Sequence, residues 1–145
     1  MEAKELSTRH FVMSGDLNHH GTLYAGRGVE WMVEAGLMAA CDVTKSEHIV
    51  CLRINALLFR KPVPMGQLLR YAGKIIHAGR TSLVAYVKVT NSITEEFIVD
   101  GYFTYVYVDE KGKAIPHGIT IEAVTEEDIR LMQTAKELAA TARSN

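Results

Sequence analysis

The sequence predicts an α+β fold in which a curved antiparallel sheet covers one long helix, with a second helix near the C-terminus. Three observations predict it. A long segment near the N-terminus is apolar at the spacing of one helix face. The later segments alternate with the two-residue period of strands. These strands do not alternate with helices, which argues against a parallel βαβ arrangement. The 145 residues fit one domain, expected to span 1–145.

The first elements are a short strand at residues 6–13, a glycine- and histidine-rich loop at 15–21, and then the helix. The apolar positions of that helix recur at i, i+3 and i+4. They are Val29, Met32, Val33, Gly36, Leu37 and Ala40. Gly28 and Gly36 each cost the helix about 1 kcal/mol relative to alanine, so we expect another backbone to approach closely there.

Four strands are expected after Thr44, at residues 48–59, 67–77, 81–90 and 95–109. Thr125 and Asp128 then resemble a capping box with aspartate in place of the usual glutamate. The helix that they open is expected at about 125–140. Its expected apolar face consists of Ile129, Met132, Ala135 and Leu138.

Bulk composition excludes several functions. A formal net charge of −1 gives no electrostatic case for nucleic acid or for an anionic membrane surface. The apolar stretches are too short to span a bilayer, and the N-terminal MEAKELSTRH lacks the apolar run of a signal peptide. Cys41 and Cys51 have no metal-ligand spacing and are interpreted as small buried hydrophobes in a reducing compartment. We therefore expect a soluble cytoplasmic protein.

The sharpest local feature lies just before the long helix, where Asn18, His19 and His20 precede Gly21 and Gly26. Backbone N–H groups at a helix N-terminus can polarise a carbonyl oxygen or hold an anion. An asparagine amide can orient a water, and a histidine can exchange a proton near neutral pH. The same residues also suit a glycine-rich turn whose asparagine only caps backbone groups. The loop alone leaves both interpretations open.

Four segments in this order resemble the acyl-CoA hydrolases of the hotdog thioesterase superfamily. They are residues 18–26 (NHHGTLYAG), 32–36 (MVEAG), 59–66 (FRKPVPMG) and 78–82 (AGRTS). The resemblance covers roughly residues 6–118. It implies a hotdog fold, in which the curved sheet wraps a central helix. It also implies dimers that pair their sheets edge to edge, often assembled further into tetramers or hexamers.

The resemblance implies hydrolysis of acyl-CoA to a free acid and CoA, without a metal or redox cofactor, since coenzyme A is part of the substrate. Active sites of this family lie between two subunits, which contribute the asparagine loop and the helix acid respectively. The acid activates water or attacks the carbonyl, and helix N–H groups hold the oxyanion.

One departure from the family pattern concerns the acid, which falls fifteen residues after the asparagine. That position is Val33 in this chain, and we expect its side chain to be buried in the apolar stripe. Glu34 follows directly, and Glu30 is placed to pair with Arg27 at i, i+3. The catalytic candidates are Asn18, His19, His20 and Glu34.

Cations and hydroxyls at two turns suit the phosphates of coenzyme A. The candidates for this contact are Lys61, Arg80, Thr81 and Ser82. Ordinary charged turn residues are the alternative interpretation. Two other functions also stay open. A 3-hydroxyacyl thioester dehydratase would use His20 and Glu34, and a non-catalytic acyl-CoA binding or sensing module would explain Val33.

Overall fold

The computed structural model describes residues 1–55 and 57–144, and it confirms the predicted class. Five strands form one antiparallel sheet in the order β1-β3-β4-β5-β2. The strands are β1 (Leu6–Phe11), β2 (Ile49–Asn55), β3 (Leu68–Ala78), β4 (Ser82–Asn91) and β5 (Phe97–Tyr107). The helices are the short 3-10 turn η1 (Ser14–Asp16), α1 (Ala25–Thr44) and α2 (Glu126–Ser144).

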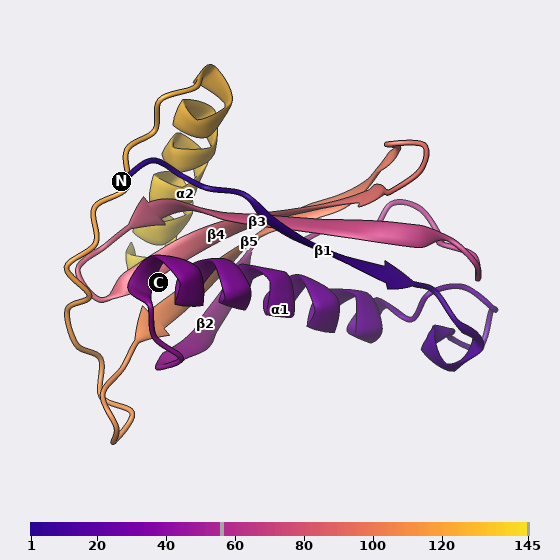
Figure 1. Ribbon diagram of the computed structural model, residues 1–145, viewed down its shortest axis with the longest axis horizontal. Helices are drawn as coiled ribbons and strands as arrows, with labels where there is room; N and C mark the ends of the chain where they lie inside the picture. Colours follow the sequence, from indigo (N-terminus) through magenta and orange to yellow (C-terminus); the bar gives the residue numbers. More distant parts are fainter. Residues whose placement is uncertain (56, 145) are drawn as a thin grey trace.

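The two long helices cover opposite faces of the sheet (Figure 1). Alternation along β4 explains this division, because neighbouring side chains of a strand point to opposite faces. Leu83, Ala85 and Val87 belong to the core beneath α1, whereas Val84 and Tyr86 belong to a second apolar cluster beneath α2. None of the described helices is long and apolar enough to cross a membrane.

The buried face of α1 is shifted around the helix from the predicted stripe. It consists of Gly28, Trp31, Met32, Ala35, Gly36, Ala39 and Ala40. Val29, Val33 and Leu37 lie on its flank and are only half-buried. The expectation of a fully buried Val33 is therefore wrong. Small residues decide which face meets the sheet, because they allow the helix to lie close to it.

Gly36 and Gly73 explain how closely α1 approaches the sheet. A Cβ at Gly73 on β3 would lie 2.9 Å from the carbonyl oxygen of Ala35, and one at Gly36 would overlap the hydroxyl of Tyr105 on β5. That hydroxyl donates a 2.6 Å hydrogen bond to the carbonyl oxygen of Val33. The predicted close approach is confirmed at Gly36, where Tyr105 is the neighbour, but it is wrong at Gly28, which has only the side chains of Leu23 and Phe59 at ordinary contact distance.

The element boundaries agree with the sequence except where local chemistry ends a strand or extends a helix. The strand predicted at 48–59 ends at Asn55, and residues 57–60 are outside regular structure, ahead of Pro62 and Pro64. Proline disfavours pairing, and it restricts the residue before it. The C-terminal helix continues to Ser144, beyond the predicted end at 140.

Helix α2 docks through an ion pair as well as through apolar contacts. The Asp128 backbone N–H donates to Thr125 Oγ1 at 3.0 Å, which is one half of the predicted capping box. The Asp128 carboxylate is buried and lies 2.6 Å from Lys74 Nζ on β3. The predicted apolar face is wrong at Ile129, which is 53% exposed; Leu131 packs on the sheet instead. The buried Asp128 therefore belongs to the face of α2 that meets the sheet.

The two cysteines are free thiols, but they are not both buried as expected. Cys41 on α1 is half-buried and Cys51 on the edge strand β2 is exposed. An edge strand leaves alternate side chains open to solvent unless another chain covers them.

Candidate active site

Asn18 organises the loop that precedes α1. Its Oδ1 accepts hydrogen bonds from the backbone N–H groups of His20 at 2.9 Å and Thr22 at 3.2 Å, and its Nδ2 donates to Thr22 Oγ1 at 3.1 Å. Gly21 adopts a φ of +78°, which closes the turn and favours glycine. The turn interpretation of Asn18 is therefore correct. It does not exclude a second role, because the amide still has one free N–H.

Backbone hydrogen bonds hold the residues just before α1 in place. The backbone N–H of Leu23 donates to the carbonyl of Val63 at 2.7 Å, and that of Tyr24 donates to the carbonyl of Asp16 at 2.8 Å. Tyr24 is the N-cap residue and makes no side-chain capping bond. A helix start without a capping side chain keeps N–H groups available for a ligand.

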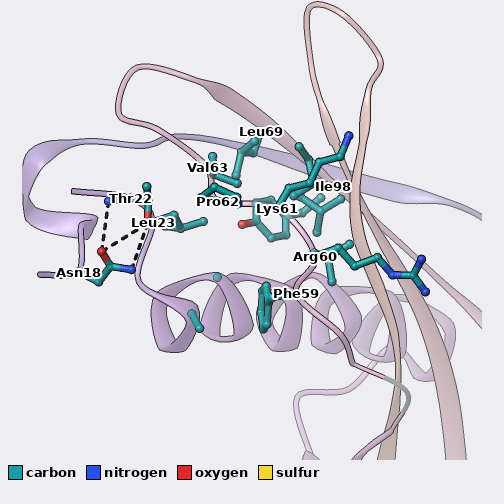
Figure 2. A pocket seen from close by; sticks show the side chains of 15 residues that line it. Asn18, Thr22, Leu23, Phe59, Arg60, Lys61, Pro62, Val63, Leu69 and Ile98 are labelled. Carbon is teal, nitrogen blue, oxygen red and sulfur yellow. Dashed lines mark hydrogen bonds between the residues drawn. The ribbon is translucent and has the colours of Figure 1, made fainter. Parts of the chain in front are cut away.

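A cavity of about 280 Å³ opens at this helix start (Figure 2). Asn18, Thr22 and Leu23 lie on one side of it, and residues 59–63 lie across from them. Ala25 and Gly28 of α1 complete that part of the wall. Among the described residues, none of the side chains that line the cavity is acidic. The cavity therefore combines polar groups at the helix start with an apolar interior.

The sheet supplies the floor of the cavity. Its lining residues there are Leu69, Tyr71, Val89, Ile98 and Val99. Tyr71 on β3 pairs in register with Val89 on β4, and Val89 pairs with Val99 on β5. These three residues form one row across the sheet beneath the N-terminal half of α1. An apolar floor of this kind suits a hydrocarbon chain.

The structure brings only some of the predicted site residues together. Asn18 and Lys61 line the cavity, and Lys61 Nζ also lies 3.2 Å from Glu96 Oε1. His19 and His20 are exposed at the loop tip, with ring centroids 4.3 Å apart, and are not part of the lining. Glu34 is exposed on α1 and is also outside the cavity of its own chain.

Arg80, Thr81 and Ser82 lie at the other end of the sheet. Arg80 and Thr81 lie in the turn between β3 and β4, and Ser82 begins β4, whereas the cavity begins at Leu69, near the start of β3. The two ends are roughly 30 Å apart, since a strand advances about 3.3 Å per residue. His117 steadies the turn, because its Nε2 lies 2.9 Å from the Ser82 carbonyl oxygen. One chain does not place these residues beside Asn18.

Sequence reasoning missed the contributions of Thr22 and Tyr71. Thr22 fixes the Asn18 amide, and Tyr71 is a 1% exposed part of the cavity floor. The alternation of Leu69 and Tyr71 in the predicted strand places both on one face and was the available signal. The predicted Arg27–Glu30 ion pair is present at 3.8 Å, and Arg27 also pairs with Asp16 at 3.4 Å. Within the described residues, no cluster of three or more His, Cys, Asp and Glu side chains is arranged to hold a metal ion.

Comparison with known families decides the identity of this fold. The family model described as the thioesterase superfamily matches residues 20–98, which is more than half of the chain. The chain belongs to the thioesterase superfamily. The matched residues begin in the asparagine loop and continue into β5, so they include most of the cavity lining and the turn between β3 and β4. The family resemblance inferred from the four motifs is confirmed.

Relatives within the superfamily share this architecture. The chain is 27% identical over 119 residues to the acyl-CoA thioester hydrolase YciA of Salmonella typhimurium, covering 77% of this chain and 89% of the relative. A crystal structure of an apo-hexameric acyl-CoA thioesterase is 30% identical, with a TM-score of 0.86, covering 97% of this chain and 91% of the other. An acyl-CoA hydrolase from Staphylococcus aureus in complex with butyryl coenzyme A is 20% identical. Its TM-score is 0.85 over 97% of this chain and 84% of the other, which shows the common fold.

Proposed function

We propose that this protein hydrolyses acyl-CoA thioesters to a free acid and CoA. The observation that carries the proposal is the cavity, which joins an uncapped helix N-terminus to an apolar floor. The acyl chain lies on the floor, and the thioester carbonyl lies at the start of α1. The relatives named as acyl-CoA thioester hydrolases support the same reaction.

The reaction needs only water as a second reactant. Water adds to the thioester carbonyl carbon, and the N–H groups at the start of α1 stabilise the negative charge on the oxygen. The carbon–sulfur bond then breaks, and CoA leaves as a thiolate that takes up a proton. No metal or redox cofactor is part of this proposal.

The base that activates the water comes from a neighbouring subunit in this proposal. The described lining of the cavity in one chain contains no carboxylate, and Val33 occupies the position that the family pattern gives to the acid. Glu34 is the adjacent exposed carboxylate on α1, so a second chain that packs against the cavity can present it. His20 is the alternative proton acceptor at the exposed loop tip.

We also propose a homodimer or larger oligomer that pairs sheets along β2. This strand lies at the edge of the sheet and exposes Val50, Leu52 and Ile54 at 50%, 61% and 40%. A long apolar edge invites pairing with another chain. The related crystal structure is that of a hexamer. The two free cysteines fit a reducing compartment, and we place the protein in the cytoplasm.

A panel of acyl-CoA thioesters tests the function, with thiol release as the measurement. We expect turnover that falls in Asn18→Ala, and light scattering is expected to give a dimer or a larger species. Val33 favours one second candidate, a module that binds acyl-CoA without hydrolysing it. Saturable binding of acyl-CoA without any thiol release would establish that candidate instead.

A further inference from the structure

The floor of the cavity contains one polar group that the proposed hydrolysis does not use. Among the five sheet residues that line the cavity, only Tyr71 carries a polar side-chain atom. It lies in one row with Val89 and Val99, and Leu69 and Ile98 complete the apolar surface around it. A hydroxyl on an otherwise apolar floor changes which ligands the cavity favours.

Two aromatic neighbours fix the Tyr71 ring. His10 on β1 stacks on Trp31 of α1, with centroids 4.4 Å apart and an interplanar angle of 5°. Tyr71 stands perpendicular to both rings, at 5.6 Å from His10 and 5.9 Å from Trp31. Side chains from one strand and one helix, β1 and α1, therefore hold the ring, which is only 1% exposed. A hydroxyl on such a ring has a fixed position.

The Tyr71 hydroxyl differs from two other buried tyrosine hydroxyls. Tyr86 donates to Asp100 at 2.6 Å, and Tyr105 donates to the Val33 carbonyl at 2.6 Å. Within residues 1–55 and 57–144, the Tyr71 hydroxyl has no protein hydrogen-bond partner. Tyr71 lines the cavity, so its hydroxyl can form a hydrogen bond to a bound molecule without losing a protein partner. A ligand in the cavity is the natural source of that partner.

The hydroxyl keeps its proton under physiological conditions. Burial raises the pKa of Tyr71 well above its usual value, and the negative charge of Asp16 raises it further. The neutral hydroxyl can both donate and accept a hydrogen bond, so it suits an alcohol or a ketone equally.

We propose that Tyr71 is a specificity-determining residue that favours acyl groups carrying an oxygen substituent, hydroxyacyl or ketoacyl, over plain alkyl chains. The thioester carbonyl belongs at the start of α1, whereas Tyr71 lies on the floor between the strands that receive the acyl chain. The assignment rests on the proposed thioesterase function. A site built to hydrogen-bond a substrate oxygen discriminates strongly against the analogue that lacks it.

Matched four-carbon substrates test the assignment. The kcat/KM of butyryl-CoA is compared with those of 3-hydroxybutyryl-CoA and 4-hydroxybutyryl-CoA. We expect one hydroxylated substrate to exceed butyryl-CoA by about tenfold or more, and Tyr71→Phe to bring the ratio close to one. Tyr102→Phe is the control, because it removes a hydroxyl from the α2 side of the sheet and should leave the ratio unchanged. A wild-type protein that prefers butyryl-CoA to both overturns the proposal, whether or not the variant folds.

A binding measurement separates this inference from the proposed reaction. Trp31 is the only tryptophan of the chain and contacts Tyr71, so its fluorescence reports on the cavity. The ligands are thioethers that cannot be hydrolysed, S-butyl-CoA and its 3- and 4-hydroxybutyl counterparts. A protein that hydrolyses nothing, but binds a hydroxylated thioether about tenfold more tightly, refutes the thioesterase and supports Tyr71. Equal affinities for all three refute the role of Tyr71.

Discussion

The two ends of β3 carry different halves of the expected chemistry. The end near Leu69 bears a cavity with Asn18, Lys61 and the start of α1, and most of its lining is apolar. The end at Ala78 leads into a turn with an exposed arginine and two hydroxyls, which lie outside the lining of that cavity. The first end suits an acyl thioester and the second suits phosphates.

We infer that one chain contains two half-sites rather than one site. About 30 Å of strand separates the ends, and α1 and the sheet are too closely packed to bend them together. A two-fold axis resolves the problem, because an isologous dimer brings opposite ends of two subunits together twice. The first prediction tests this inference.

Mixed oligomers are expected to recover activity that each variant has lost. Asn18→Ala impairs the cavity end and Arg80→Glu impairs the turn, where a reversed charge repels phosphate. In a random mixture, half of the dimers are heterodimers, and each has one intact and one doubly impaired site. About a quarter of the sites are then intact. The activity at low substrate concentration should therefore rise to about a quarter of the wild-type activity.

The control for the mixing experiment pairs two variants of the same end, Asn18→Ala and Thr22→Val, and should show no recovery. Both mixtures are unfolded and refolded together, so that subunits exchange. If Asn18→Ala and Arg80→Glu also fail to complement each other, the two motifs act within one chain, and the half-site comparison is wrong.

The sequence predicted the fold and the local motifs because these depend on short-range chemistry. Alternation along β4 and helical spacing in α1 are visible without a structure, as are the glycines at the turns. The burial of individual side chains was less predictable. Ile129 is exposed and Leu131 is partly buried against the sheet, on the side of α2 that the Lys74–Asp128 ion pair holds, and such a pair joins residues distant in sequence.

The relation between motifs was the least predictable feature of the site. The family resemblance named Asn18 and Arg80 as parts of one function, but sequence order does not give the length of strand that separates them. Val33 shows the same limit within α1. Its position fits the apolar stripe, yet the sheet contacts the neighbouring small residues Ala35 and Gly36, which leaves Val33 on the flank.

Replacing Asn18 alone is expected to lower kcat by on the order of tenfold or more, with little change in stability. The Asn18 side chain fixes the turn through the N–H groups of His20 and Thr22, and Asn18 also lines the cavity. Thr22→Val separates the two roles, because it removes only the hydroxyl that accepts from Nδ2. Steady-state kinetics and thermal unfolding of both variants check this. Wild-type kcat in Asn18→Ala would remove the loop from the mechanism.

A carboxylate at position 33 is expected to raise kcat by about tenfold, given the usual effect of a well-placed base. Val33 is only half-buried, so Val33→Asp should fold with a small loss of stability. Glu34→Gln should lower kcat if Glu34 is the present base. We would compare kcat for the three proteins on one acyl-CoA. The wild type could instead turn over strongly, with kcat unchanged in Glu34→Gln and reduced in Val33→Asp. That result would mean that the base lies elsewhere.

The smallest expected effect is a rise in KM, roughly two- to fivefold, when Arg80 is replaced by alanine. Arg80 is exposed at the turn, so water and salt weaken its attraction for a phosphate, and the contact is the same before and during hydrolysis. KM should therefore change while kcat stays constant, and the difference in KM should shrink as ionic strength increases.

Arg60→Ala is the matched control, since it removes another exposed arginine, from the cavity end. If phosphate binds only at the turn, truncated substrates without the nucleotide should be hydrolysed equally by Arg80→Ala and wild type. A KM unaffected by Arg80→Ala would place the nucleotide away from this turn and leave the cavity end as the whole site.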